Sequence, residues 1–159
     1  MTNSLVLIRL ILDKEIDMIN FSPSQYVCFK LNKAMRKVSR SYEAHLAPFS
    51  ITPAQFFVLS SLFETDEVKF KVLAEKLSME GPNLTGILDR LERMDWIERR
   101  DDPEDRRSLL ICLTKHARKH HDEFAKLVDT IDSKLQKRFN PADFKIFTEI
   151  LNEIGDKVI

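Results

Sequence analysis

The segment from Ile97 to Thr114 constrains the fold more than any other part of the chain. It has the sequence IERRDDPEDRRSLLICLT, in which two short runs of alternating apolar and polar residues flank a charged stretch with one proline. This pattern predicts a β-hairpin. Its charged tip interleaves carboxylates with Arg99, Arg100, Arg106 and Arg107. Such a concentration of arginine is poorly suited to a core and well suited to contacts with phosphate groups.

Helical periodicity precedes the hairpin. A capping residue is followed by proline at Ser22 and again at Thr52, and both pairs predict the start of a helix. Apolar residues at helical spacing predict helices over about 22–46, 52–64, 69–77 and 82–94. Closely spaced helices, the last two joined by a tight turn and followed by a hairpin, have the element order of a winged helix-turn-helix. We therefore expect a mainly α fold with a small β-hairpin wing.

Amphipathic segments outside this module need a partner. The first helix and the residues after Thr114 each carry an apolar stripe, and such helices are unstable alone in water. We expect the stripes to pack together and on a second copy of the chain. The N-terminal apolar run is split by Arg9 and is too short to span a bilayer, so we expect no membrane contact. The predicted parts are an N-terminal arm over 1–21, a helical dimerisation region over 22–47 and 115–159, and a winged helix-turn-helix domain over 48–114.

The composition restricts the class of protein. With 43% hydrophobic and 31% charged residues, the chain is not disordered. Its formal net charge is zero, so any binding of nucleic acid has to come from local patches. The two cysteines, Cys28 and Cys112, do not make a disulfide scaffold, and we expect the protein in the reducing cytoplasm.

The sequence has no pattern typical of an enzyme. It lacks a catalytic set of Ser, His and Asp, and its three glycines leave little room for a phosphate-binding loop. His116 and His120 are four residues apart, but we interpret them as a solvated helix face rather than as metal ligands. We expect no enzymatic activity, no cofactor and no metal. A helical module that binds protein through its wing is the other alternative, although apolar residues at the tip would suit that role better.

On these residues the chain resembles the MarR family (regulators of the multiple-antibiotic-resistance type) over roughly residues 22–159. The match to the family's wing pattern, D-x-R-x-x-x-x-x-L-T, lies at Asp105, Arg107, Leu113 and Thr114. The runs LAEKL from Leu73 and LTGILDRLE from Leu84 match the two central helices of the family. The resemblance implies a homodimer with interlocked terminal helices that binds double-stranded DNA and regulates transcription. We expect a repressor that an effector releases from a pseudo-palindromic operator.

The resemblance also implies roles within the wing. Arg107 is expected to enter the minor groove, and Asp105 to orient it through a salt bridge. A narrow A·T minor groove has an enhanced negative potential that attracts an inserted arginine. The remaining arginines of the hairpin are expected to contact phosphates; they are Arg99, Arg100 and Arg106.

The helix that begins at Pro82 is the expected recognition helix. Near its start, Asn83 is suited to pair with an adenine edge, and Thr85 to contact a thymine methyl group or a phosphate. Gly86 lowers helix stability, which is explained either by close approach to DNA or by flexibility alone. Two basic residues further along are either phosphate clamps or ion-pair partners of neighbouring carboxylates; they are Arg90 and Arg93, beside Asp89 and Glu92.

Cys28 is a candidate sensor of oxidants. Its context, QYVCFKL, resembles the N-terminal cysteine context of the organic-hydroperoxide-sensing branch of the family. In that branch tyrosines polarise the thiolate. Tyr42 occupies one matching place, whereas Pro53 and Asn32 replace two others. A sensing thiol has to be accessible and of low pKa, and the alternative is that Cys28 is a small buried hydrophobe.

A small aromatic acid is the other expected effector. The aromatic-rich stretch that includes Phe49 and Phe56, with Arg36 or Arg40 nearby, is suited to bind one. The alternative is that these aromatic side chains belong to the core.

Overall fold

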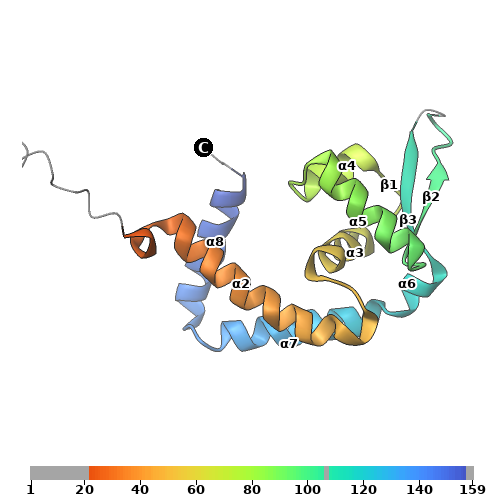
Figure 1. Cartoon of the computed structure of the whole chain (residues 1–159). Coiled ribbons are helices and arrows are strands. Elements are labelled where there is room, and N and C mark those ends of the chain that lie inside the picture. The colour runs from red at the N-terminus through yellow and green to blue at the C-terminus, as the bar shows by residue number, and fades with distance from the viewer. Residues whose placement is uncertain (1–21, 106–107, 157–159) are drawn as a thin grey trace, which may run out of the picture. The chain divides into compact units, whose positions relative to one another are not determined.

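The computed structural model describes residues 22–105 and 108–156 (Figure 1). The predicted arm over 1–21 and the wing residues Arg106 and Arg107 lie outside the described residues. The chain divides into two compact units, Met1–Arg40 and Ser41–Ile159. The helical elements are η1 (Pro23–Gln25), α2 (Val27–Leu46), η2 (Ala47–Phe49), α3 (Pro53–Glu64), α4 (Phe70–Lys76), α5 (Gly81–Arg93), α6 (Lys115–Lys119), α7 (His121–Gln136) and α8 (Pro141–Asp156).

Three short strands form an antiparallel sheet in the order β1–β3–β2. The strands are β1 (Val68–Lys69), β2 (Ile97–Asp101) and β3 (Leu109–Leu113). β2 and β3 form the predicted hairpin, with Ile97 opposite Leu113 and Asp101 opposite Leu109. β1 pairs with the other edge of β3 and was not predicted. The predicted class, mainly α with a small β wing, is confirmed.

The helices of the winged module begin and end within one residue of their predicted bounds, whereas the helix predicted over about 22–46 begins later than expected. The Ser22–Pro23 pair starts the 3-10 turn η1, so α2 begins only at Val27. The segment after Thr114 is divided into α6 and α7, because the chain leaves helical geometry at His120.

The start of α3 follows from local capping. The Thr52 hydroxyl accepts a hydrogen bond from the Gln55 N–H (3.3 Å), and the Gln55 side chain accepts one from the Thr52 N–H (2.8 Å). Pro53 occupies the first helical position, where no N–H is needed. These contacts satisfy orphan donors of the first turn, and the predicted start at Thr52–Pro53 is confirmed.

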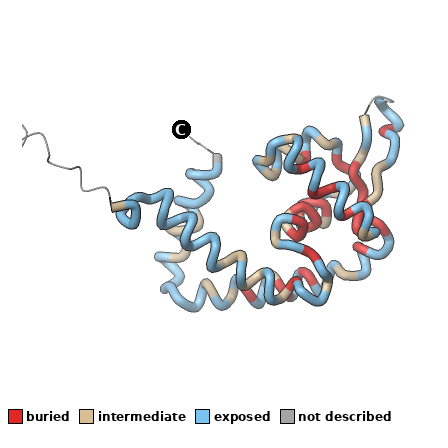
Figure 2. Tube along the Cα trace, viewed as in Figure 1, coloured by how far each residue is buried: buried red, intermediate tan, exposed pale blue. Residues whose placement is uncertain are grey.

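The core of the second unit lies where α3, α5 and the sheet meet, as Figure 2 shows in red. Fully buried side chains include Phe56, Leu59, Leu62, Leu84, Leu88, Leu91, Ile97 and Ile111. Each such side chain contributes about 1.5–3 kcal/mol through removal from water. Phe124 of α7 joins this core, with its ring centroid 5.3 Å from Phe56 and 5.5 Å from Trp96. The beginning of α7 is therefore anchored on the winged module.

The terminal helices keep apolar side chains exposed. On α2 these include Val27 and Met35, and on α8 they include Ile146 and Ile150. Faces of this kind are typical of surfaces that bind another chain. Within the described residues no single helix is long and apolar enough to cross a membrane; only a bent pair, 27–49 with 53–64, has the length and composition.

Replacing Thr114 with alanine is expected to destabilise the junction between β3 and α6. The buried Thr114 hydroxyl accepts a hydrogen bond from the Ala117 N–H (3.1 Å) and donates one to the carbonyl of Asp95 (2.6 Å). Because both backbone groups lose this partner, the free energy of unfolding in urea should fall by about 1–3 kcal/mol. Thr130→Ala is the matched control, since the exposed Thr130 hydroxyl bonds within α7 and its loss should change stability by less than about 0.5 kcal/mol. Equal losses in the two variants would contradict the assignment.

Candidate nucleic-acid interface

One face of α5 is buried and the other is exposed. The inward residues are Leu84, Ile87, Leu88 and Leu91, which recur at the spacing of one helical face. The outward residues include those predicted from the sequence, namely Asn83, Thr85, Gly86, Arg90 and Arg93. Burial of the leucines thus presents the predicted contact residues together on one exposed face.

Thr85 and Gly86 are the small residues of this exposed face. The Thr85 hydroxyl donates a hydrogen bond to the carbonyl of Gly81 (2.9 Å), which leaves its methyl group and lone pairs for other contacts. A Cβ added at Gly86 would meet no atom within 4 Å. Packing within the described chain therefore does not require this glycine, and a close approach to DNA stays a prediction.

Arg99 joins the wing to the exposed face of α5. It lies within β2 rather than at the hairpin tip, where the sequence had placed it. Its guanidinium pairs with Asp89 (2.7 Å) and with Glu92. The ion-pair role considered for Arg90 and Arg93 with these carboxylates is thus filled by Arg99. The Arg93 Nε instead donates to the backbone carbonyl of Asp89 (3.0 Å).

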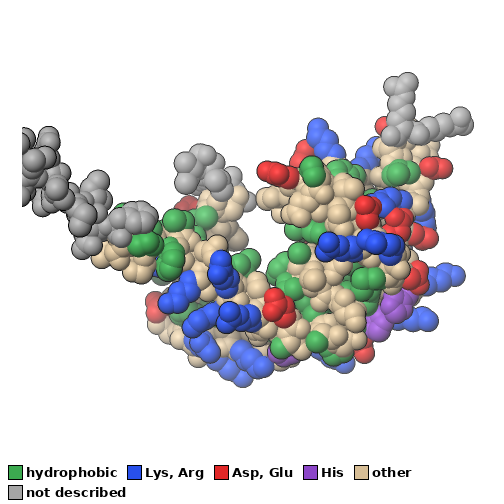
Figure 3. Space-filling view, in the orientation of Figure 1, with side chains coloured by type: hydrophobic (Ala, Val, Ile, Leu, Met, Phe, Trp, Pro, Cys, Tyr) green, Lys and Arg blue, Asp and Glu red, His purple; other side chains and the backbone are tan. Residues whose placement is uncertain are grey.

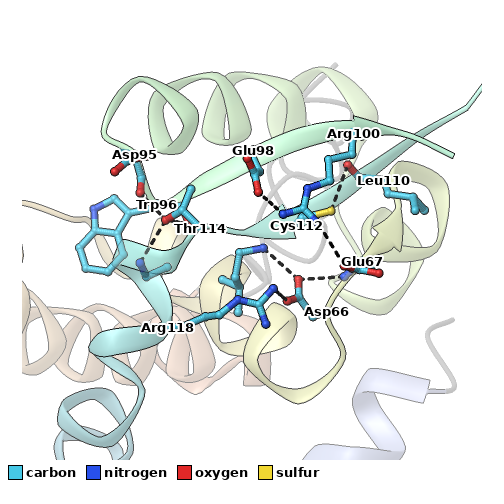
Figure 4. A network of polar contacts seen from close by, with 12 residues as sticks. Asp66, Glu67, Asp95, Trp96, Glu98, Arg100, Leu110, Cys112, Thr114 and Arg118 are labelled. Atoms are coloured by element: carbon cyan, nitrogen blue, oxygen red, sulfur yellow. Dashed lines mark hydrogen bonds and ion pairs between the residues drawn. The ribbon is translucent and has the colours of Figure 1, made fainter.

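Arg100 also lies within β2 and not at the tip. It pairs with Glu98 of the same strand and, at 3.3 Å, with Glu67, which precedes β1 (Figure 4). Cys112 lies opposite Glu98 on β3 and is fully buried. Burial raises the pKa of the Cys112 thiol more than the nearby Arg100 lowers it. This environment fits a structural role for Cys112.

Asp66 holds the base of the hairpin to its neighbours (Figure 4). One of its oxygens accepts a hydrogen bond from the Leu113 N–H of β3 (2.9 Å), and the other pairs with Arg118 of α6 (2.5 Å). Sequence reasoning missed this residue, because both partners lie far along the chain and no local pattern marks them.

Asp102 organises the loop between β2 and β3. Its Oδ1 accepts a hydrogen bond from the Glu104 N–H (2.9 Å), and its Oδ2 accepts one from the Ser108 hydroxyl (2.9 Å) and lies 2.8 Å from the Lys69 Nζ. Among the residues that the structure describes, Asp102 is the only charged residue that is buried, with 3% of its surface exposed. The sequence had grouped it with the solvated carboxylates of the tip. The DPE triplet is the signal for its role, because an aspartate tends to accept the N–H two residues later in a turn.

The charge of Asp102 is strongly favoured. The hydrogen-bonded Lys69 ammonium, the Glu104 N–H and the Ser108 hydroxyl together hold the pKa of Asp102 at about 2. Asp102 in turn raises the pKa of Lys69. The pair is therefore ionised throughout the physiological pH range.

Asp105 lies at the edge of the described wing loop and is exposed. Its backbone carbonyl accepts hydrogen bonds from the Ser108 N–H (2.9 Å) and the Ser108 hydroxyl (3.1 Å). Arg106 and Arg107 lie outside the described residues, so the expected Asp105–Arg107 salt bridge and the groove contact stay predictions.

The sensor candidates have contrasting environments. Cys28, near the start of α2, is exposed in the single chain, and its role as a sensor stays a prediction. Tyr42 is half-buried against Phe56 and Phe57, with ring centroids 5.6 and 5.4 Å away. Burial and, to a smaller extent, Asp132 raise the pKa of Tyr42, so its hydroxyl remains a hydrogen-bond donor.

Phe49 and Phe56 both pack on the core of the second unit. Phe56 is a core residue with 1% exposure, and the half-buried Phe49 packs on Trp96 and Phe124. The core alternative thus fits Phe56, and a pocket role for Phe49 stays a prediction. Arg36 and Arg40 instead line a groove along α2, where Figure 3 shows basic side chains gathered; its other residues are Phe29, Asn32, Lys33 and Lys37.

The two histidines of the predicted solvated face pack on an aromatic ring. His116 and His120 lie 4.8 and 5.3 Å from the Trp96 ring, and the His120 Nδ1 lies 2.6 Å from a Glu123 oxygen. In residues 22–105 and 108–156 no group of three or more His, Cys, Asp or Glu side chains is placed to hold a metal ion.

Comparison with known proteins identifies relatives of this architecture. The family model described as MarR family matches residues 51–109. The HTH-type transcriptional regulator YwoH of Bacillus subtilis is 27% identical over 127 residues, which cover 80% of this chain and 92% of that protein. The organic hydroperoxide resistance transcriptional regulator of Bacillus subtilis is 34% identical over 89 residues, which cover 56% of this chain and 60% of that protein.

The same architecture occurs in a DNA complex. The transcriptional repressor CouR, bound to a 23-mer DNA duplex, superposes with a TM-score of 0.75 at 28% sequence identity. The match covers 83% of this chain and 94% of that one. The winged module and its flanking helices are thus those of known transcriptional regulators.

The stability of the protein is expected to depend on pH through Asp102. The pKa of Asp102 falls from an ordinary 3.8 to about 2 on folding, so the folded state favours the charged carboxylate. This stabilisation is present above the unfolded pKa and is lost as the pH falls through the folded pKa. The stability difference between wild type and Asp102→Asn in urea unfolding should therefore shrink between roughly pH 5 and pH 2. Asp101→Asn, at the exposed end of β2, is the control; a wild-type advantage over Asp102→Asn that stayed constant with pH would contradict the prediction.

Proposed function

Since the chain belongs to the MarR family of DNA-binding transcriptional regulators, we propose that it acts as a homodimeric repressor of transcription. Each subunit lays α5 in the major groove and the wing in the adjoining minor groove of a pseudo-palindromic operator. The observation that carries this proposal is the division of α5, whose leucines are buried while Asn83, Thr85 and Arg90 face outward. The family comprises regulators rather than enzymes.

We propose that residues 22–47 and 115–159 dimerise and that residues 48–114 bind DNA. Support comes from the apolar side chains that α2 and α8 leave exposed, which a second copy of the chain would cover. A two-fold dimer reads half-sites about one helical turn apart. Because its partner is DNA, we also propose a cytoplasmic location.

The wing provides the first test of this proposal. Arg107→Ala is expected to weaken binding to an operator selected from random duplexes by about 1–3 kcal/mol, because an arginine is lost from the narrow minor groove. The slope of log affinity against log salt should become shallower by about one. The control is Arg138→Ala, which removes the same charge from an exposed position between α7 and α8. Equal affinities of Arg107→Ala and wild type would refute the wing assignment.

An oxidant is the signal that we propose first. Support comes from the exposed Cys28 thiol and from the 34% identity to a regulator named for organic hydroperoxide resistance. The Cys28 thiolate attacks the peroxide O–O bond, forms a sulfenic acid and releases the alcohol. A small aromatic acid is the alternative signal, supported by the groove that Arg36 and Arg40 line with Phe29.

Cumene hydroperoxide is expected to release operator DNA from the wild type but not from Cys28→Ser, as measured by fluorescence anisotropy. Cys112→Ala is the matched control and should respond like the wild type, because Cys112 is fully buried with a raised pKa. Release from Cys28→Ser at the wild-type peroxide concentration would exclude Cys28 as the sensor.

A further inference from the structure

Lys69 occupies a position where a lysine has no local advantage. It is the N-cap residue of α4, and its side chain makes no capping hydrogen bond. Ser, Thr, Asp and Asn are preferred there, because their side chains accept a backbone N–H of the first turn. A lysine has no acceptor to offer. The structural role of the Lys69 side chain is therefore to be sought in contacts outside α4.

The partner of Lys69 is the loop between β2 and β3. Its ammonium lies 2.8 Å from an oxygen of Asp102, whose side chain is 3% exposed while that of Lys69 is 44% exposed. Pairing of β1 with β3, in which Lys69 lies opposite Leu110, holds the lysine backbone close to the end of the loop. The ion pair thus links the start of the helix-turn-helix to the wing.

Asp102 fixes both ends of the described loop. Its carboxylate holds the Glu104 N–H and the Ser108 hydroxyl, and its own N–H donates to the Ser108 carbonyl (3.1 Å). The Ser108 N–H in turn donates to the carbonyl of Asp105. The Asp102 carboxylate therefore joins the two described ends of the loop where it leaves the sheet.

We propose that Lys69 is a positioning residue for DNA binding, which acts through Asp102 to set the orientation of the wing in the minor groove. This inference rests on the proposed function. Lys69 thus contributes to a preference for A·T-rich DNA without contacting a base. A wing in another orientation no longer fits the narrow minor groove of such DNA.

The test compares two duplexes and six proteins, one of them a control. One duplex is an operator selected by the wild type, and the other carries G·C pairs in place of the A·T pairs under the wing. The proteins are the wild type, Lys69→Met, Lys69→Arg, Asp102→Asn and the double variant Lys69→Met/Asp102→Asn. Lys71→Met is the matched control, because it removes a cation from the first turn of α4 at an exposed residue, whose ion-pair partner among the described residues is Glu75. Thermal unfolding shows that each variant is folded at the assay temperature.

Lys69→Met and Asp102→Asn are each expected to lose about tenfold affinity for the A·T-rich operator, the scale of one good groove contact. They should lose little on the G·C duplex, and the double variant should lose no more than either single variant. Lys69→Arg should retain most of the affinity, and Lys71→Met should match the wild type.

Two results would overturn the inference while leaving the proposed function intact. In the first, Lys69→Met binds like Lys71→Met. In the second, Lys69→Met loses affinity equally on both duplexes while Asp102→Asn binds as tightly as the wild type, which is the signature of a direct phosphate contact by Lys69. Failure of the wild type to select any operator would instead contradict the proposed function itself.

Discussion

Burial of one face of α5 is the constraint on which the rest of the structure depends. Leu84, Leu88 and Leu91 are fully buried in the core that α5 shares with α3 and the sheet. Because a helix has 3.6 residues per turn, burial of these positions leaves the intervening ones exposed as a group. The packing of α5 and the DNA contact that we propose for it therefore lie on different sides of one helix.

The pairing of carboxylates explains how a chain of zero net charge presents a surface to a polyanion. Asp89 and Glu92 both form ion pairs with Arg99, and Asp102 forms one with Lys69. Each pair removes a negative charge that would repel phosphate, but it also occupies a cation. A phosphate contact by Arg99 would require this residue to give up a carboxylate. The phosphate contacts expected of the hairpin are thus in competition with its internal ion pairs.

The sequence predicted those helices whose start or buried face depends on contacts between residues close together in the chain. The cap at Thr52 and the leucine spacing of α5 are each visible within a few residues, and both predictions are confirmed. β1 escaped prediction because a strand of two residues has no periodicity, and it exists only because β3 offers an edge. The ion pairs of Asp102 with Lys69 and of Arg99 with Asp89 and Glu92 were not predicted, because these partners lie on other elements, where sequence spacing gives no information.

Other long-range contacts hold the winged module firmly to α6 and α7. Arg118 of α6 pairs with Asp66, and Thr114 bonds to the carbonyl of Asp95, so the start of α6 is held from two sides. Phe124 continues the connection by packing on the core. A displacement of α7 is consequently transmitted to the module as a whole rather than absorbed in a loose joint. In the homodimer that we propose, a signal received in the helical region can therefore change the spacing of the two α5 helices without unfolding either module.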